Sequence, residues 1–220
     1  MRLRARLAGL VAVLGILVAG AQDADRMLRT LTTRYGNDAQ NLYRNWRELV
    51  AQGGGQADVE KLRRVNDFFN RRIRFSDDTV VWSQVDYWAT PLETIGRAAG
   101  DCEDFTIAKY FSLIELGVPP NQLRFTYVRA RIGAPDSGIT QAHMVLSYYA
   151  SPSAEPLVLD NLIGEIRPAS RRPDLSPVFS FNSDGVFMAG ADRPTSPVDR
   201  LARWTDLLLR MKTEGYEPLK

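Results

Sequence analysis

The stretch GDCEDFTIAKYFSLIELG, residues 100–117, predicts the central element of the fold and holds the chain's one cysteine. From Phe105 onward, apolar side chains cover nearly the whole circumference of a helix, and such a helix belongs in the interior of a protein. Gly117 and the two prolines that follow it end the helix. Cys102 is therefore expected at or next to the N-terminus of a buried helix.

Helical patterns dominate the sequence before this stretch. Apolar residues recur at helical spacing from Asp23 to about Phe75; a run of three glycines, 53–55, breaks the pattern, and Asp58 is expected to cap the next helix. Further along, Thr90-Pro91-Leu92-Glu93 has the form of a capping box at the start of a short helix that ends by Gly100.

Strand patterns follow the buried helix. Alternating β-forming and polar residues predict strands at Leu123–Arg131, Ala142–Tyr149, Pro156–Leu162, Val178–Asn182 and Val186–Met188. A last amphipathic helix is expected from about Pro197 to Lys212. Helices first and strands later predict an α+β fold, in which a helical N-terminal lobe packs with an antiparallel sheet.

The first residues read as a targeting segment. Three arginines precede an apolar run that ends in Ala19-Gly20-Ala21, a pattern typical of a secretory signal cleaved after residue 21. An uncleaved anchor is the alternative, but the apolar run is shorter than the roughly 20 residues of a spanning helix. We expect a signal peptide over 1–21 and one domain over 22–220, with helices over about 22–120, the sheet over about 121–190 and a C-terminal helix over about 197–212.

The charge balance excludes one class of partner. The chain has 28 basic and 26 acidic residues, and removal of the three arginines in the signal leaves 25 basic residues. The mature chain is therefore close to neutral and has no basic stripe with interleaved aromatics, so no nucleic-acid partner is expected.

Cys102 and His143 form the one pairing of thiol and imidazole that the chain can offer, since it contains a single cysteine and a single histidine. Exported proteins usually pair their cysteines in disulfides, so this free thiol is either incidental or kept for chemistry. The exposed amides and the dipole of a helix N-terminus favour the nucleophilic thiolate. The alternatives are a small buried residue at position 102 and a structural imidazole at position 143.

Asp160 closes the apolar stretch PLVLDN and is the expected partner of the imidazole. A carboxylate on the strand next to His143 would accept from one ring nitrogen and fix the tautomer and orientation of the ring. Asn161 is the neighbouring alternative, and an ordinary turn residue at the strand end is the plainer interpretation of Asp160.

Three acidic residues, Asp101, Glu103 and Asp104, surround the cysteine. Unpaired carboxylates would raise the pKa of the thiol and oppose catalysis. A hard divalent cation resolves this conflict, because clustered oxygen ligands suit Ca²⁺. Acids that face solvent and complement the helix dipole are the alternative.

An oxyanion site would need the main-chain amide of Cys102 and one further donor. Gln84 and Trp82, in VVWSQVDYW, are candidates for that donor, and their positions do not choose between them.

Several separated motifs resemble one family. GDCEDFTIAKYFSL, AHMVLSYY, PLVLDNL and the upstream DYWATPLET are similar to those of the bacterial transglutaminase-like cysteine proteinases, and most closely to the LapG-type periplasmic proteases that release large biofilm adhesins. The similarity runs from about Val65 to Met188, and PVFSFNSDG also fits.

The resemblance implies a papain-like, transglutaminase-type fold with Cys102 as nucleophile, His143 as base and Asp160 as orienting acid. It also implies calcium at Asp101 and Glu103, with Asp104 as a further ligand. Proteases of this type cut the N-terminal region of an adhesin, and the periplasmic domain of an inner-membrane cyclic di-GMP receptor holds them inactive.

Three other functions stay open on the sequence. An NlpC-like peptidoglycan hydrolase and a transglutaminase would use a similar fold and a similar thiol. A non-catalytic scaffold would retain the site and only bind partners.

Overall fold

The computed structural model describes residues 24–134, 136–191 and 193–217. The signal peptide expected over residues 1–21 lies outside these described residues. Within the described ranges, no helix combines the length and the apolar character needed to cross a bilayer.

The N-terminal half is helical, as predicted. Residues 24–35 form a helix, and α2 (Ala39–Gln52), α3 (Asp58–Arg72), α4 (Asp78–Val81), α5 (Pro91–Arg97) and α6 (Cys102–Glu115) follow it. The capping box of α5 is confirmed. The cap expected at Asp58 is wrong: Ala57 is the N-cap of α3, and the Asp58 carboxylate instead accepts from Lys61 and from the Tyr148 hydroxyl.

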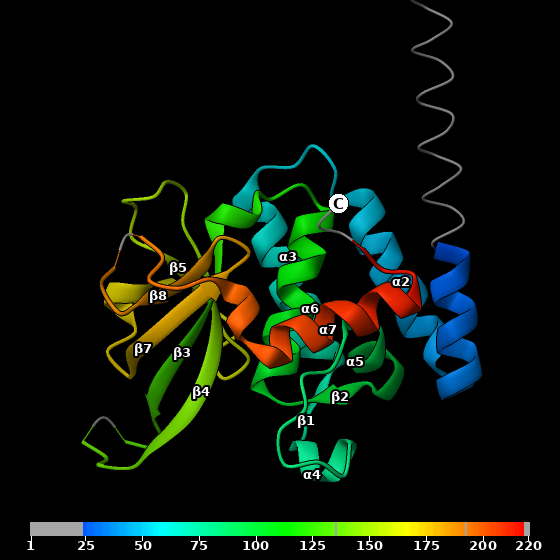
Figure 1. Cartoon of the computed structure of the whole chain (residues 1–220), viewed down its shortest axis with the longest axis horizontal. Helices are drawn as coiled ribbons and strands as arrows, with labels where there is room; N and C mark the ends of the chain where they lie inside the picture. The colour runs from blue at the N-terminus through cyan, green and yellow to red at the C-terminus, as the bar shows by residue number, and fades with distance from the viewer. Residues whose placement is uncertain (1–23, 135, 192, 218–220) are drawn as a thin grey trace, which may run out of the picture.

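The six-stranded sheet has the order β6-β5-β4-β3-β7-β8, and each adjacent pair is antiparallel. Its strands are β3 (Leu123–Arg131), β4 (Thr140–Tyr148), β5 (Leu157–Leu159), β6 (Arg167–Pro168), β7 (Leu175–Asn182) and β8 (Gly185–Met188). Figure 1 shows the helices gathered on one side of this sheet. The predicted strands are confirmed, although β5 is shorter than expected because the chain turns away after Leu159.

A second, two-stranded pairing lies apart from the sheet (Figure 1). β1 (Arg74–Phe75) runs parallel to β2 (Ala99–Gly100), and the N–H of Ser76 continues the pairing with a hydrogen bond to the carbonyl oxygen of Gly100. This contact brings the start of α4 beside the start of α6. The sequence patterns did not predict it.

The buried helix is confirmed as the centre of the core. Residues 104–113 of α6 are all buried, between the neighbouring helices and the sheet. The last helix, α7 (Ala202–Glu214), begins later than expected, after a short 3-10 turn at Val198–Arg200. Trp204 of α7 stacks on Phe111 of α6 with ring centroids 5.9 Å apart. The core therefore holds the N-terminus of α6 in a fixed place against the sheet.

Candidate active site

The N-terminus of α6 is closed by a reciprocal capping box. The Asp101 carboxylate accepts from the N–H groups of Glu103 (3.1 Å) and Asp104 (3.4 Å), while the Asp104 carboxylate accepts from the N–H of Asp101 (3.4 Å). Gly100 precedes the box, and a Cβ there would lie 2.5 Å from a carboxylate oxygen of Asp104. This stretch of backbone presents Cys102 as the first residue of the helix.

The thiol of Cys102 is half-buried and bonded to its neighbour. Sγ donates a hydrogen bond to Oε2 of Glu103 at 2.6 Å. Burial raises the pKa of this thiol, and the charges of Glu103 and Asp101 raise it further. The conflict predicted between the acids and the thiol is therefore present in the structure: the carboxylates favour the protonated thiol.

The N-terminus of α6 lies against the part of β4 that β5 does not cover. β5 pairs with β4 only as far as Leu146, so β5 leaves the main-chain groups of Met144 unpaired. The N–H of Met144 faces the Cys102 thiol instead, and the Thr106 hydroxyl lies 3.2 Å from the Met144 carbonyl oxygen. Helix and strand are thus joined one residue away from His143.

His143 is 6% exposed, and its Nε2 lies 2.7 Å from Oδ1 of Asp160. Nε2 is therefore the nitrogen that Asp160 orients, and Nδ1 is left for a second partner. Asp160 also accepts from the N–H of Leu162 (3.0 Å) and from Arg172 (2.7 Å). Burial alone would raise the pKa of Asp160, but the hydrogen bonds from His143, Leu162 and Arg172 hold it at about 2. The structure thus brings together the predicted imidazole and carboxylate, and Asp160 rather than Asn161 is the partner.

Three carboxylates meet beside the capping box. Oxygens of Asp78, Asp101 and Asp104 lie within 4.8 Å of one another, and Asp101 also joins Glu103 and the Cys102 thiol in a second group of the same kind. Burial, together with the neighbouring acids, raises the pKa of Asp101 to about 9 and that of Asp104 to about 8. The predicted ligands Asp101, Glu103 and Asp104 are therefore split between two adjoining groups that share Asp101.

Asp78 was missed by the sequence analysis. It is buried at the start of α4, and one carboxylate oxygen accepts from the N–H of Tyr87. The other oxygen, Oδ1, has no hydrogen-bond partner among the described residues. A buried, unpartnered carboxylate oxygen in a cluster of acids is the feature that a hard cation would satisfy. No local pattern marks Asp78, because the pairing of β1 with β2 brings it to the site.

Among the described residues, neither candidate oxyanion donor forms a hydrogen bond with Cys102. Trp82 is packed against the ring of Tyr87 and the guanidinium of Arg97. Its indole N–H is buried near the Asp104 carboxyl, and no acceptor of the described residues lies within hydrogen-bonding distance of it. Gln84 is exposed and lines a surface cavity with Trp88 of the same loop. A second oxyanion donor therefore stays a prediction.

Comparison with known proteins identifies the family of this chain. A model of the family described as bacterial transglutaminase-like cysteine proteinase (BTLCP) matches residues 38–173, which include Cys102, His143 and Asp160. The chain belongs to this family. Membership of the transglutaminase-like cysteine proteinases indicates a proteolytic enzyme that uses a thiol. No curated protein matches the chain.

Solved structures confirm the fold of this transglutaminase-like proteinase. A structure of LapG from Legionella pneumophila is 37% identical, with a TM-score of 0.72 over 86% of this chain and 97% of that chain. An EGTA-treated LapG structure from the same organism gives 37% identity and a TM-score of 0.74 with the same coverage. A calcium-bound LapG structure is 40% identical, with a TM-score of 0.72 over 84% of this chain and 97% of that chain. The predicted LapG-type α+β fold is therefore confirmed.

Proposed function

We propose that this chain is a calcium-dependent periplasmic cysteine endopeptidase with Cys102, His143 and Asp160 as its catalytic triad. One observation carries the proposal: a buried His143–Asp160 pair lies next to the residue whose main-chain N–H faces the thiol at the N-terminus of α6. A thiol, an imidazole and an orienting carboxylate in that order are the parts of a cysteine protease. The family to which the chain belongs supports the same assignment.

The geometry suggests a role for each nitrogen of the imidazole. Asp160 holds the Nε2–H, so Nδ1 is the atom that takes the proton from Sγ as the sulfur attacks the peptide carbonyl. The protonated ring then gives that proton to the leaving amine, and a thioester to Cys102 remains. Water, deprotonated by the same Nδ1, cleaves the thioester and restores the thiol.

Calcium is the proposed cofactor, and the residues present fit it. Asp78, Asp101 and Asp104 would supply carboxylate oxygens, the unpartnered Oδ1 of Asp78 among them, and Glu103 adjoins the group. When bound, the cation would cancel the negative charge that raises the pKa of the Cys102 thiol. The calcium-bound and EGTA-treated structures of LapG support this choice of ion.

The proposed substrate is the N-terminal region of a large cell-surface adhesin, and its cleavage would release cells from a biofilm. The proposed regulator is the periplasmic domain of an inner-membrane cyclic di-GMP receptor, which would sequester the enzyme. The motifs shared with LapG-type proteases and the structural likeness to LapG support both proposals. The signal-like segment over residues 1–21 supports the periplasmic location.

The test uses the mature protein, residues 22–220, with the N-terminal region of a large adhesin from the same genome. We expect a discrete cleavage in calcium, none after chelation and none with Cys102→Ala, provided that this variant keeps the native circular dichroism spectrum. Cleavage by Cys102→Ala would overturn the assignment of the nucleophile. Release of cell-wall fragments or incorporation of an amine, without adhesin cleavage, would favour the hydrolase or the transglutaminase instead.

A further inference from the structure

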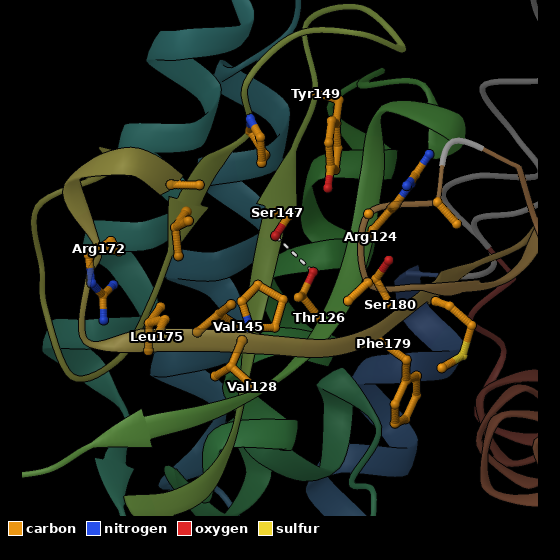
Figure 2. Close-up of a pocket in the computed structure, with 18 residues that line it drawn as sticks. Arg124, Thr126, Val128, Val145, Ser147, Tyr149, Arg172, Leu175, Phe179 and Ser180 are labelled. Atoms are coloured by element: carbon orange, nitrogen blue, oxygen red, sulfur yellow. Dashed lines mark hydrogen bonds between the residues drawn. The ribbon is translucent and has the colours of Figure 1, made fainter. Parts of the chain in front are cut away.

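Arg172 is buried behind the proposed triad. It follows the 3-10 turn at Ala169–Arg171, and it is 2% exposed. Figure 2 shows it among the residues of a cavity of about 260 Å³ that is lined by β4 side chains such as Val145 and Ser147. These side chains alternate along β4 with Met144 and Leu146 of the main core, so the cavity lies on the face of the sheet opposite the core.

The guanidinium of Arg172 joins two carboxylates. Nη2 lies 2.7 Å from Oδ2 of Asp160 and 2.7 Å from Oδ2 of Asp174, and Nε lies 3.0 Å from Oδ1 of Asp174. Asp174 is partly exposed, whereas Asp160 and Arg172 are both buried. The planar guanidinium is therefore fixed from outside by Asp174 and presents one N–H to Asp160.

Every acceptor of Asp160 is occupied. Oδ1 faces His143 and the N–H of Leu162, Oδ2 faces Arg172, and the main-chain carbonyl accepts from Asn70 at 2.7 Å. Contacts at both oxygens fix the plane of the carboxylate, and this plane sets the direction in which the imidazole N–H points. Without Arg172, Oδ2 would be buried and unpartnered.

Arg172 is also the permanent cation next to Asp160. Among the described residues, the other titratable groups that interact with this carboxylate are His143 on β4, Lys109 on α6 and Asp174 beyond Arg172. Burial lowers the pKa of Lys109 to about 7, against the attraction of Asp160, so the charge of this lysine is incomplete at neutral pH. A guanidinium stays protonated at any pH of interest. Arg172 thus adds a hydrogen bond from a fixed cation to the hydrogen bonds from His143 and Leu162 that keep Asp160 ionised.

We propose that Arg172 is a positioning residue of this enzyme: it holds the Asp160 carboxylate ionised and in the plane that orients His143 toward Cys102. This inference rests on the proposed triad.

The test is a double-mutant cycle between positions 172 and 160. Four proteins are compared in calcium: wild type, Arg172→Met, Asp160→Asn and the double variant. The readouts are the rate at which iodoacetamide alkylates the single thiol, and kcat and KM for the adhesin fragment. If Arg172 acts through Asp160, Arg172→Met lowers the alkylation rate and kcat about 10- to 100-fold in the wild type. In the Asp160→Asn background, which has no carboxylate to hold, the same change has an effect of less than about threefold.

A structural role would give a different pattern. Arg47→Met is the matched control, since Arg47 pairs with Glu115 at the far end of α6 (2.6 Å) and its loss tests only the cost of a broken ion pair. We expect it to lower the melting temperature and leave the alkylation rate unchanged. Equal losses from Arg172→Met in both backgrounds, or no loss in either, would overturn the proposal.

A second variant keeps the test decisive if Arg172→Met folds poorly. Arg172→Lys keeps the charge and should retain more activity than Arg172→Met. In Arg172→Met the acid limb of the alkylation profile should move to higher pH, because the pKa of Asp160 is held less low, and in Arg172→Lys it should move less. An unmoved acid limb in a folded variant would contradict the proposal. Alkylation needs no substrate, so an absence of adhesin cleavage would refute the proposed substrate and leave this test intact.

Discussion

Two helices of this protein begin with the same local motif in opposite electrostatic surroundings. At α5, Thr90 accepts from the N–H of Glu93, and the Glu93 carboxylate accepts from the N–H of Thr90. Arg210 then meets the Glu93 carboxylate at 2.6 Å. At α6, Asp101 and Asp104 form the same reciprocal box.

Within the described part of the chain, the second box lacks an ion-paired counter-charge. Its nearest charged neighbours are Asp78 and Glu103, and no Lys or Arg of the described residues forms an ion pair with any of these four carboxylates. Ionising neighbouring buried acids is costly unless a cation joins them. The α5 box is therefore a helix cap whose charge is neutralised within the protein, whereas the α6 box gathers acids that the proposed cation would neutralise.

The largest expected effect comes from removing the cation proposed for the α6 box. Chelation should slow both alkylation of Cys102 and cleavage of the adhesin fragment by about 100-fold, because the acids then favour the protonated thiol. The measurement is a chelator titration followed by restoration with calcium, with magnesium as the control ion. A thiol equally reactive with and without calcium would show that the α6 box needs no cation.

The next prediction tests whether Asp78 is a ligand of the proposed calcium ion. Asp78→Asn should weaken the affinity for calcium about tenfold, since it removes the charge of the carboxylate whose Oδ1 has no protein partner. Isothermal titration calorimetry of calcium binding measures this. Asp86→Asn is the matched control, because Asp86 lies in the loop after α4, pairs with Arg203 at 2.7 Å and is outside the cluster. If the two variants bind calcium equally well, Asp78 is not a ligand.

Asp78 also shows where sequence analysis stops. The buried helix, the strands and the α5 capping box were predictable, because periodicity and capping residues are local properties of the chain. The partnership of His143 with Asp160 was predictable because adjacent strands were expected and the chain has one histidine. The place of Asp78 depends on the parallel pairing of β1 with β2, two strands of two residues each, and such short strands leave no periodic signal.

Arg172 was missed for a related reason. It follows a short 3-10 turn rather than a patterned strand, and among several arginines nothing local distinguishes it. Asp58 shows the opposite failure, in which a local pattern predicts a helix cap that the fold does not form. It is a favoured N-cap type that instead begins the helix, because Lys61 and Tyr148 occupy its carboxylate.

A third prediction concerns stability against pH. The pKa values of Asp101 and Asp104 are raised in the folded state to about 9 and about 8, from the ordinary value of 3.8. Between about pH 4 and pH 9 the native state thus keeps protons that the unfolded chain releases, so the stability of the chelated protein falls as pH rises through this window. Calcium would replace those protons and flatten the dependence. Thermal melts at successive pH values, with chelator and with calcium, measure the difference. A chelated protein that gains stability over this window would contradict it.

The smallest effect belongs to the α5 box. Thr90→Ala removes the side-chain cap and should destabilise the protein by about 1 kcal/mol, or about 2–4 °C in melting temperature. Because the charge of Glu93 is already met by Arg210, this loss should be the same with calcium and with chelator. Thr90→Ser keeps the hydroxyl acceptor and is the control, expected to melt near the wild type. A loss from Thr90→Ala that appeared only after chelation would mean that the two boxes are coupled through the loop between them, and that the α5 box also belongs to the cation site.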